Sequence, residues 1–309
     1  MSQKGGSRMA DICLLIDTPD DFSFTESLEY LSRSADECMF HIRDGRVTRA
    51  IEVGGNPVLF GMEQHPDGIL VNIDGEVEGA AAGVERFIRD WLDLARDLVP
   101  FYELSERDPL LRDAVHRHQG LRVVGIPDLF ETFVWAILGQ QITVAFAYVL
   151  KRRFVETFGQ AIEAGGVTHY LFPSVETVAG LEPEALRELK ITARKSEYII
   201  GVARMIADGE LTKEGLLALG DDRAIEQRLT AIRGIGPWTA NYVLMRCLRS
   251  PDAYPAADVG LHNALKLVAG LDRKPTLPEV ETFAEPWKGW RAYATFYLWR
   301  YLGSEMEQG

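Results

Sequence analysis

The hydrophobic periodicity of this chain changes near residue 100, and that change limits the folds it can adopt. Upstream, short β-like runs alternate with turn signals such as Asp44-Gly45, a pattern typical of antiparallel strands joined by hairpins. Downstream, almost every segment has a helical period, with glycine or proline at the joints. The predicted strands are 38–42, 47–53, 57–62 and 68–73, and the predicted helices upstream are 24–34 and 83–95.

The predicted fold class is therefore α+β, a small N-terminal antiparallel α/β domain followed by an all-helical domain. We expect the first domain at 10–100 and the second at 101–309, after a disordered or non-native tail at 1–9. The helical domain is expected to have two lobes, about 128–250 and 101–127 plus 251–309. Its predicted helices are 129–138, 142–158, 183–189, 194–208, 222–232, 239–248, 260–267, 277–283 and 290–302.

The net charge of −13 argues against a nucleic-acid partner bound mainly through charge. The acidity is uneven, because residues 1–100 hold 19 acidic and 9 basic side chains and so account for −10 of it. A site for a polyanion is therefore expected in the last two thirds of the chain.

The sequence has no run of about 18 apolar residues, so no membrane span is expected. The N-terminus lacks the apolar stretch of a secretory signal. Cys13, Cys38 and Cys247 lie far apart, which argues against disulfides and against a structural zinc site. These features favour a reducing, intracellular location, the cytoplasm or nucleoid.

The sharpest local signal is the segment 225–248, where two helical patterns meet at Gly234-Ile235-Gly236-Pro237. Pro237 suits the first turn of the second helix. Two glycines around one isoleucine allow a tight turn that buries Ile235 and points backbone N–H groups outward. Such groups at a helix N-terminus bind phosphate without any side-chain charge. An ordinary αα-hairpin explains the pattern about equally well, so this segment alone leaves both interpretations open.

Further motifs accompany the hairpin in a fixed order. Asp258 stands twenty residues after Trp238, and the segments 136–141, 172–174 and 287–294 read AILGQQ, FPS and WKGWRAYA. Together with IRGIGPWTANYVLMR, they resemble the HhH-GPD superfamily of DNA glycosylases, and within it the DNA-3-methyladenine glycosylase II branch (the AlkA type). The resemblance covers residues 100–302 strongly and the first domain weakly.

The resemblance implies a monofunctional DNA glycosylase of base excision repair. Such an enzyme flips alkylated bases, such as 3-methyladenine, out of duplex DNA. It then hydrolyses the N-glycosidic bond and leaves an abasic site. The implied partner is double-stranded DNA containing alkylated bases, bound by a monomer.

The resemblance assigns the chemistry to Asp258. A carboxylate near C1′ stabilises the positive charge of an oxocarbenium-like transition state and can orient water. The alternative is a helix N-cap, because Asp is favoured there and a helix is predicted from residue 260. The roles are compatible, since a carboxylate at a helix N-terminus stays ionised. Val259 and Gly260 are smaller than the family pattern has, so a wider pocket is expected.

Four aromatic side chains are candidates for the base pocket. An alkylated purine carries positive charge, and aromatic faces attract it by stacking and cation–π contact. Core packing is the alternative for each ring. The candidates are Trp238, Tyr242 and Trp299, on positions that line the family's pocket, and Tyr30 from the N-terminal domain.

The resemblance also implies the DNA contacts. Gln141 falls where the family inserts a wedge into the gap left by the flipped base, and a helix C-terminal polar residue is the alternative. Relatives that also cut the strand have a lysine at the position of Trp238, and tryptophan cannot form an imine. No lyase activity is therefore expected. The hairpin contacts are expected at Arg233, Gly234, Ile235, Gly236 and Thr239.

No cofactor and no side-chain metal site is expected, because no His/Cys cluster has ligand spacing. His116 and His118 are expected on a solvated loop. The family hairpin can hold a monovalent or alkaline-earth ion on backbone carbonyls, and the resemblance allows such an ion here.

Two other functions stay open. A non-catalytic helix–hairpin–helix DNA-binding module would need neither Asp258 nor the surrounding Trp and Tyr residues. An oxidised-base glycosylase with lyase activity would need the lysine that Trp238 replaces.

Overall fold

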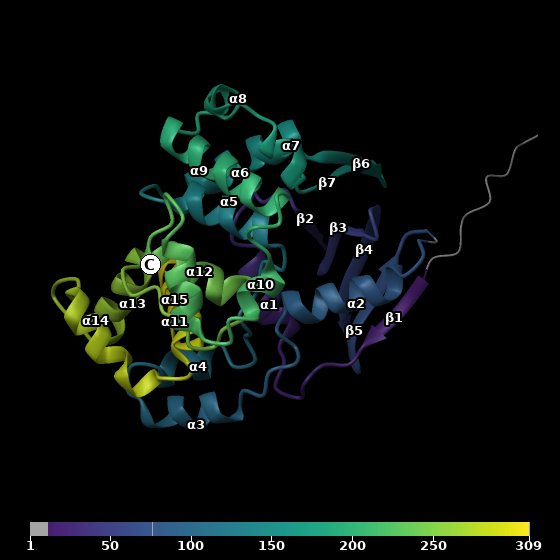
Figure 1. Cartoon of the computed structure of the whole chain (residues 1–309). Coiled ribbons are helices and arrows are strands. Elements are labelled where there is room, and N and C mark those ends of the chain that lie inside the picture. Colours follow the sequence, from purple (N-terminus) through teal and green to yellow (C-terminus); the bar gives the residue numbers. More distant parts are fainter. Residues whose placement is uncertain (1–11, 76, 309) are drawn as a thin grey trace, which may run out of the picture.

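A five-stranded antiparallel sheet forms the N-terminal part of the chain. It belongs to a computed structural model that describes residues 12–75 and 77–308 (Figure 1); the predicted tail at 1–9 lies outside them. The strand order is β1-β5-β4-β3-β2. The strands are β1 (Ile12–Ile16), β2 (Phe40–Arg43), β3 (Arg46–Val53), β4 (Asn56–His65) and β5 (Gly68–Ile73).

Four of these strands are predicted from short β-like runs between turn signals, and β1 is not. In β5, Ile69, Val71 and Ile73 alternate toward the core and are fully buried. The edge strand β1 lacks this alternation, because Leu15 on its outer face is apolar yet 51% exposed. Helix α2 (Ala80–Trp91) packs against the sheet, and α1 (Phe24–Leu31) precedes β2.

The second part of the chain is predominantly helical, which confirms the predicted class. Figure 1 shows its helices gathered on one side of the sheet. They are α3 (Val99–Arg107), α4 (Arg112–Arg117), α5 (Leu129–Gly139), α6 (Val144–Phe158), α7 (Val175–Ala179), α8 (Pro183–Glu188), α9 (Ala193–Ala207), α10 (Lys213–Leu217), α11 (Asp222–Thr230), α12 (Pro237–Arg246), α13 (Val259–Val268), α14 (Leu277–Ala284), the 3-10 helix η1 (Glu285–Trp287) and α15 (Arg291–Gln308).

The expectation that this part is all-helical was wrong at one place. Strands β6 (Gln160–Ala164) and β7 (Val167–Leu171) form an antiparallel hairpin. Its turn, Gly165-Gly166, has positive φ at both residues, which is the backbone that a two-residue hairpin requires. Leu171 packs against Ala50 and Leu59 of the N-terminal sheet. The Gly165-Gly166 turn signal is present in the sequence, but the prediction for this part considered only helical periods.

Four charged side chains are buried where the sheet meets the helices. Arg49 in β3 pairs with Glu131 in α5 at 2.9 Å, and Lys151 in α6 pairs with Glu131 at 3.2 Å and with Glu37 at 3.1 Å. Burial raises the pKa of Glu37, but Lys151 and the backbone N–H of Met39 outweigh it, so the pKa of Glu37 lies below its ordinary value. The network ties the loop after α1 to the helical part, because removing one partner would leave a buried charge unpaired.

The loop expected at His116 and His118 was wrong, and the solvation expected there holds for the exposed His116 but not for His118. His116 lies in α4. His118 is 3% exposed, and its ring nitrogens contact Glu26 at 3.0 Å and Ser304 at 3.2 Å. The short helix and its contacts with distant residues carry no local sequence signal.

Among the described residues, no helix is both long and apolar enough to cross a membrane.

Candidate active site

The hairpin between α11 and α12 has the tight turn that the sequence predicts. Ile235 is 4% exposed and packs into the core between the helices. Gly234 has a φ of +88°, and a Cβ there would lie 2.3 Å from the ring of Tyr198. Glycine is therefore required at this position for two reasons, the left-handed backbone and the packed tyrosine beneath it.

The hairpin presents backbone N–H groups to its surroundings. Within the described part of the chain, the amides of Gly234, Gly236, Trp238 and Thr239 have no hydrogen-bond acceptor. Gly236, the N-cap of α12, is exposed. Unsatisfied N–H groups at a helix N-terminus are suited to bind an anionic oxygen.

The side chains of two predicted DNA contacts are partly engaged inside the protein. Arg233 is exposed but pairs with Glu197 at 3.0 Å. Thr239 is 2% exposed, and its hydroxyl accepts a hydrogen bond from Gln140 at 3.1 Å. A contact by Thr239 would therefore use its backbone N–H.

Gln140 links helix α5 to the hairpin, a role that the sequence did not suggest. It is the C-cap of α5, and its side-chain amide donates to the Gly234 carbonyl and to the Thr239 hydroxyl, both at 3.1 Å. Gln141, the predicted wedge, follows it at an exposed position with a φ of +57°. The C-terminal role considered for Gln141 thus belongs to Gln140. Gln141 is the exposed residue that follows it, next to the residue that contacts the hairpin.

Asp258 is held by three donors. Its Oδ1 accepts the Leu261 N–H at 2.8 Å, so it caps α13 as the alternative prediction had it. Oδ1 also accepts the indole N–H of Trp299 at 2.9 Å, and Oδ2 accepts the indole N–H of Trp238 at 2.9 Å. An ionised carboxylate has about four acceptor positions, so one position, on Oδ2, is left for a ligand.

Gly260 does not widen the pocket, contrary to the expectation from its size. A Cβ at Gly260 would lie 3.0 Å from Oδ1 of Asp258 and 3.2 Å from the indole nitrogen of Trp299. The missing side chain therefore lets Trp299 reach the carboxylate, and the indole fills the space. Val259 points away and is 63% exposed.

Three of the four predicted aromatic side chains form a continuous row beside Asp258. Trp238 and Tyr242 are stacked with ring centroids 5.3 Å apart, and Trp299 lies 6.4 Å from Tyr242. The Tyr242 hydroxyl accepts hydrogen bonds from Trp135 and Arg246, both at 2.7 Å. Burial raises the pKa of Tyr242 to about 12, so it stays a neutral phenol.

Tyr30 stands apart from this row. Its ring packs on Phe296 at 4.5 Å, and Phe296 in turn lies 6.2 Å from Trp299. The guanidinium carbon of Arg33 lies 3.9 Å from the centroid of the Tyr30 ring. One face of Tyr30 is thus already covered by a cation of the protein.

No sequence signal predicts three further residues that contact the row or its neighbours. They are far from the hairpin in sequence: Trp135 lies on α5, Tyr148 on α6 and Arg33 in the loop after α1. Arg246 could have been predicted weakly from its spacing, because it follows Tyr242 by four residues in α12 and residues at i and i+4 share a helix face. No group of three or more His, Cys, Asp or Glu side chains in the described residues is arranged to hold a metal ion.

The family model described as HhH-GPD superfamily base excision DNA repair protein matches residues 134–289. That for the N-terminal domain of 8-oxoguanine DNA glycosylase matches residues 33–133. The chain belongs to the HhH-GPD superfamily of base excision DNA repair proteins.

Three relatives show how far the similarity extends. A DNA-3-methyladenine glycosylase of Bacillus subtilis is 46% identical over 94% of this chain and 97% of its own length. The structure of a 3-methyladenine DNA glycosylase from Archaeoglobus fulgidus has the same fold, with a TM-score of 0.81, 24% identity, and coverage of 94% of this chain and 97% of its own. A Schizosaccharomyces pombe 3-methyladenine DNA glycosylase in complex with abasic DNA has a TM-score of 0.51, 26% identity, and coverage of 63% of this chain and 92% of its own.

Proposed function

We propose that this protein is a monofunctional DNA glycosylase that releases alkylated purines, such as 3-methyladenine, from duplex DNA and leaves an abasic site. The observation that carries the proposal is a carboxylate, Asp258, at the edge of an aromatic row and twenty residues after a phosphate-binding type of hairpin. The names of its relatives support the alkylated base as substrate.

Asp258 acts on the sugar. Breaking the bond between the base and C1′ develops positive charge on the sugar ring, and an ionised carboxylate nearby stabilises it. The two indole N–H groups and the cap N–H fix the carboxylate and leave one acceptor position on Oδ2. That position faces C1′ or accepts a hydrogen bond from the attacking water.

The aromatic row receives the flipped base. A cationic alkylpurine stacks on the rings of Trp238 and Tyr242, with Trp299 beside them. Gln141 fills the gap in the duplex from its exposed tip. Specificity then rests partly on the leaving group, because a cationic base departs as a neutral molecule and a normal base does not.

The hairpin binds the DNA backbone through its free amides. In an acidic protein, this arrangement supplies phosphate contacts without added positive charge. Few lysine or arginine contacts imply weak binding to undamaged DNA and a shallow dependence on salt. A monovalent or alkaline-earth ion on the hairpin carbonyls would add to this contact. The protein acts as a monomer on chromosomal DNA, in the cytoplasm or nucleoid.

Strand cleavage is not part of the reaction. Trp238 offers no amine. The nearest lysines in the sequence, Lys213 and Lys266, lie outside the motif, and Lys213 is bonded to Asp90 and to the Pro127 carbonyl. Water is therefore the nucleophile, and no Schiff base forms.

The test uses a duplex oligonucleotide with one 7-methylguanine, incubated with the protein and divided into samples with and without hot alkali. Strand breaks only after alkali would support the proposal. Breaks without alkali would instead support the oxidised-base type of glycosylase with lyase activity. Binding with no base release would support a non-catalytic DNA-binding module.

A further inference from the structure

Two arginines beside the aromatic row have no carboxylate partner among the residues that the structure describes. Arg246 is 3% exposed and donates to the Val124 carbonyl at 2.6 Å and to the Tyr242 hydroxyl at 2.7 Å. Arg33 is exposed and donates through Nε to the Tyr148 hydroxyl at 2.7 Å. A buried arginine is normally paired with an acid, so this end of the row has an excess of positive charge.

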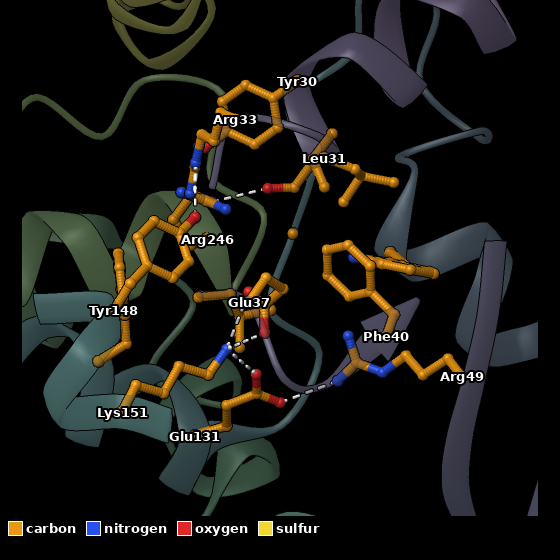
Figure 2. A pocket seen from close by; sticks show the side chains of 15 residues that line it. Tyr30, Leu31, Arg33, Glu37, Phe40, Arg49, Glu131, Tyr148, Lys151 and Arg246 are labelled. Atoms are coloured by element: carbon orange, nitrogen blue, oxygen red, sulfur yellow. Dashed lines mark hydrogen bonds and ion pairs between the residues drawn. The ribbon is translucent and has the colours of Figure 1, made fainter. Parts of the chain in front are cut away.

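Three tyrosines hold these two cations together, and Figure 2 shows Arg33 between Tyr30 and Tyr148. The guanidinium carbons of Arg33 and Arg246 lie 3.9 Å and 5.6 Å from the Tyr30 ring centroid. Burial raises the pKa of Tyr30, but Arg246 and Arg33 outweigh it, so that pKa lies below its ordinary value. We call Arg33, Arg246, Tyr30, Tyr148 and Tyr242 the cationic wall.

The other charges nearby do not neutralise the cationic wall. Lys151 and Arg49 are already paired with Glu37 and Glu131 (Figure 2). A cavity of about 30 Å³ borders these residues and four members of the cationic wall, all except Tyr242. It has room for about one or two water molecules and not for a purine. A flipped base would therefore contact the cationic wall only with the edge of its ring.

Cationic alkylpurines and uncharged purines should respond differently to the positive charge of the cationic wall. When C1′–N9 of a cationic alkylpurine breaks, the bonding electrons neutralise the base. When the same bond breaks in an uncharged purine, the bonding electrons stay with the base, which leaves as an anion. Water bonds to C1′ and loses a proton to Asp258 or to solvent, and the base later takes up a proton from solvent. Donors that face the leaving anion stabilise it, whereas they do nothing for a base that leaves neutral.

We propose that Arg33 is a specificity-determining residue, whose N–H groups bind the acceptor edge of an uncharged purine and stabilise it as it leaves. This inference rests on the proposed function. Arg33 uses Nε for Tyr148 and a further hydrogen bond for Tyr30, and a guanidinium has five N–H donors, so donors are left for a base. The Tyr148 phenol and the Tyr30 ring hold the Arg33 guanidinium among aromatic side chains, so its ligand is the base and not a backbone phosphate.

The experiment measures single-turnover release, at saturating enzyme, from two duplexes that differ only in the lesion, hypoxanthine or 7-methylguanine. In Arg33→Gln, hypoxanthine release should fall about 100-fold, in line with the loss of one transition-state donor. Release of 7-methylguanine should change less than about twofold. Tyr148→Phe removes the acceptor that holds Arg33 and should shift the ratio of the two rates in the same direction by a smaller factor.

Arg152→Gln is the matched control, because Arg152 is an arginine near the same loop that pairs with Asp36 at 3.1 Å. It should leave both rates unchanged. Equal losses for both lesions in Arg33→Gln, with weaker binding to a duplex carrying an abasic analogue, would mean a phosphate contact and would overturn the inference. Wild-type release of 7-methylguanine but not hypoxanthine would overturn it as well. Release of neither lesion would instead refute the proposed function itself.

Discussion

The hairpin and the Asp258 corner offer different kinds of groups to a ligand. The Asp258 corner is Asp258 with its three hydrogen-bond donors, the indoles of Trp238 and Trp299 and the Leu261 N–H. The hairpin offers backbone amides, and its side chains are small, buried or already paired. The Asp258 corner offers one side chain whose position is fixed by two indole N–H groups and a cap. We infer that the hairpin binds DNA and the corner performs the chemistry, so variants should separate the two tasks.

The largest effect is expected at the corner. Asp258→Asn keeps the N-cap, because Asn is as favourable there as Asp, but it removes the negative charge. The rate of base release at saturating enzyme should fall about 1,000-fold. Affinity for a duplex with an abasic analogue, measured by fluorescence anisotropy, should stay within about twofold. A rate within tenfold of wild type would assign the chemistry to another group.

The next effect is expected at the hairpin. Gly234→Ala forces a left-handed backbone on alanine and a contact with Tyr198, at a cost of about 1–3 kcal/mol. DNA affinity should fall at least tenfold, while the rate from bound complex changes little.

Gly236→Ala is the matched control for that variant. Its φ is −92°, and nothing lies within 4 Å of the added Cβ. Urea denaturation should therefore show only the loss of about 1 kcal/mol that alanine costs at an N-cap, which is smaller than in Gly234→Ala. Equal loss of stability in both variants would argue that the fit on Tyr198 is irrelevant.

A smaller effect is expected at the two indoles. Trp238→Phe and Trp299→Phe each remove one hydrogen bond to Asp258 while keeping an aromatic face. A charged hydrogen bond contributes about 1.5–3 kcal/mol, so each variant should lose roughly tenfold or more in the single-turnover rate. The double variant should lose less than the product of the two factors, because both act through one carboxylate. A weaker affinity with an unchanged rate would mean that the indoles only stack on the base.

The smallest effect on function is expected outside both regions. The pKa of Glu37 is lowered in the folded protein. Its stabilising contribution is therefore present above the ordinary carboxyl pKa and is lost as the pH falls through the lowered value. Urea denaturation of Glu37→Gln should show a stability lower by about 3–5 kcal/mol at pH 7 and a smaller loss on acidification than in wild type. Base release should be unaffected at neutral pH, where the fold is intact.

The sequence was sufficient where the interacting residues are close along the chain. The hairpin turn, the burial of Ile235 and the position of Asp258 before α13 all lie within one segment, so spacing and turn chemistry predict them. The fold class followed from periodicity in the same way. The β6–β7 hairpin was missed although its Gly-Gly turn is local, because the surrounding helical pattern dominated the interpretation.

The rest of the site depends on contacts that sequence spacing does not encode. Trp299 reaches Asp258 across 41 residues through the space that Gly260 leaves. Arg33 contacts Tyr148 across 115 residues, and this pair places a cation over Tyr30, the ring that the sequence predicts to stack on a cationic base. Tertiary packing alone brings these groups together, so the cationic wall could be found only in the folded structure.

The division of tasks between the two regions can be tested in one measurement. Asp258→Asn and Gly234→Ala are compared side by side for affinity to the abasic-analogue duplex and for the single-turnover rate of 7-methylguanine release. The account predicts that Asp258→Asn loses rate and keeps affinity, and that Gly234→Ala loses affinity and keeps rate. Loss of both properties in both variants, with each protein still folded, would contradict it.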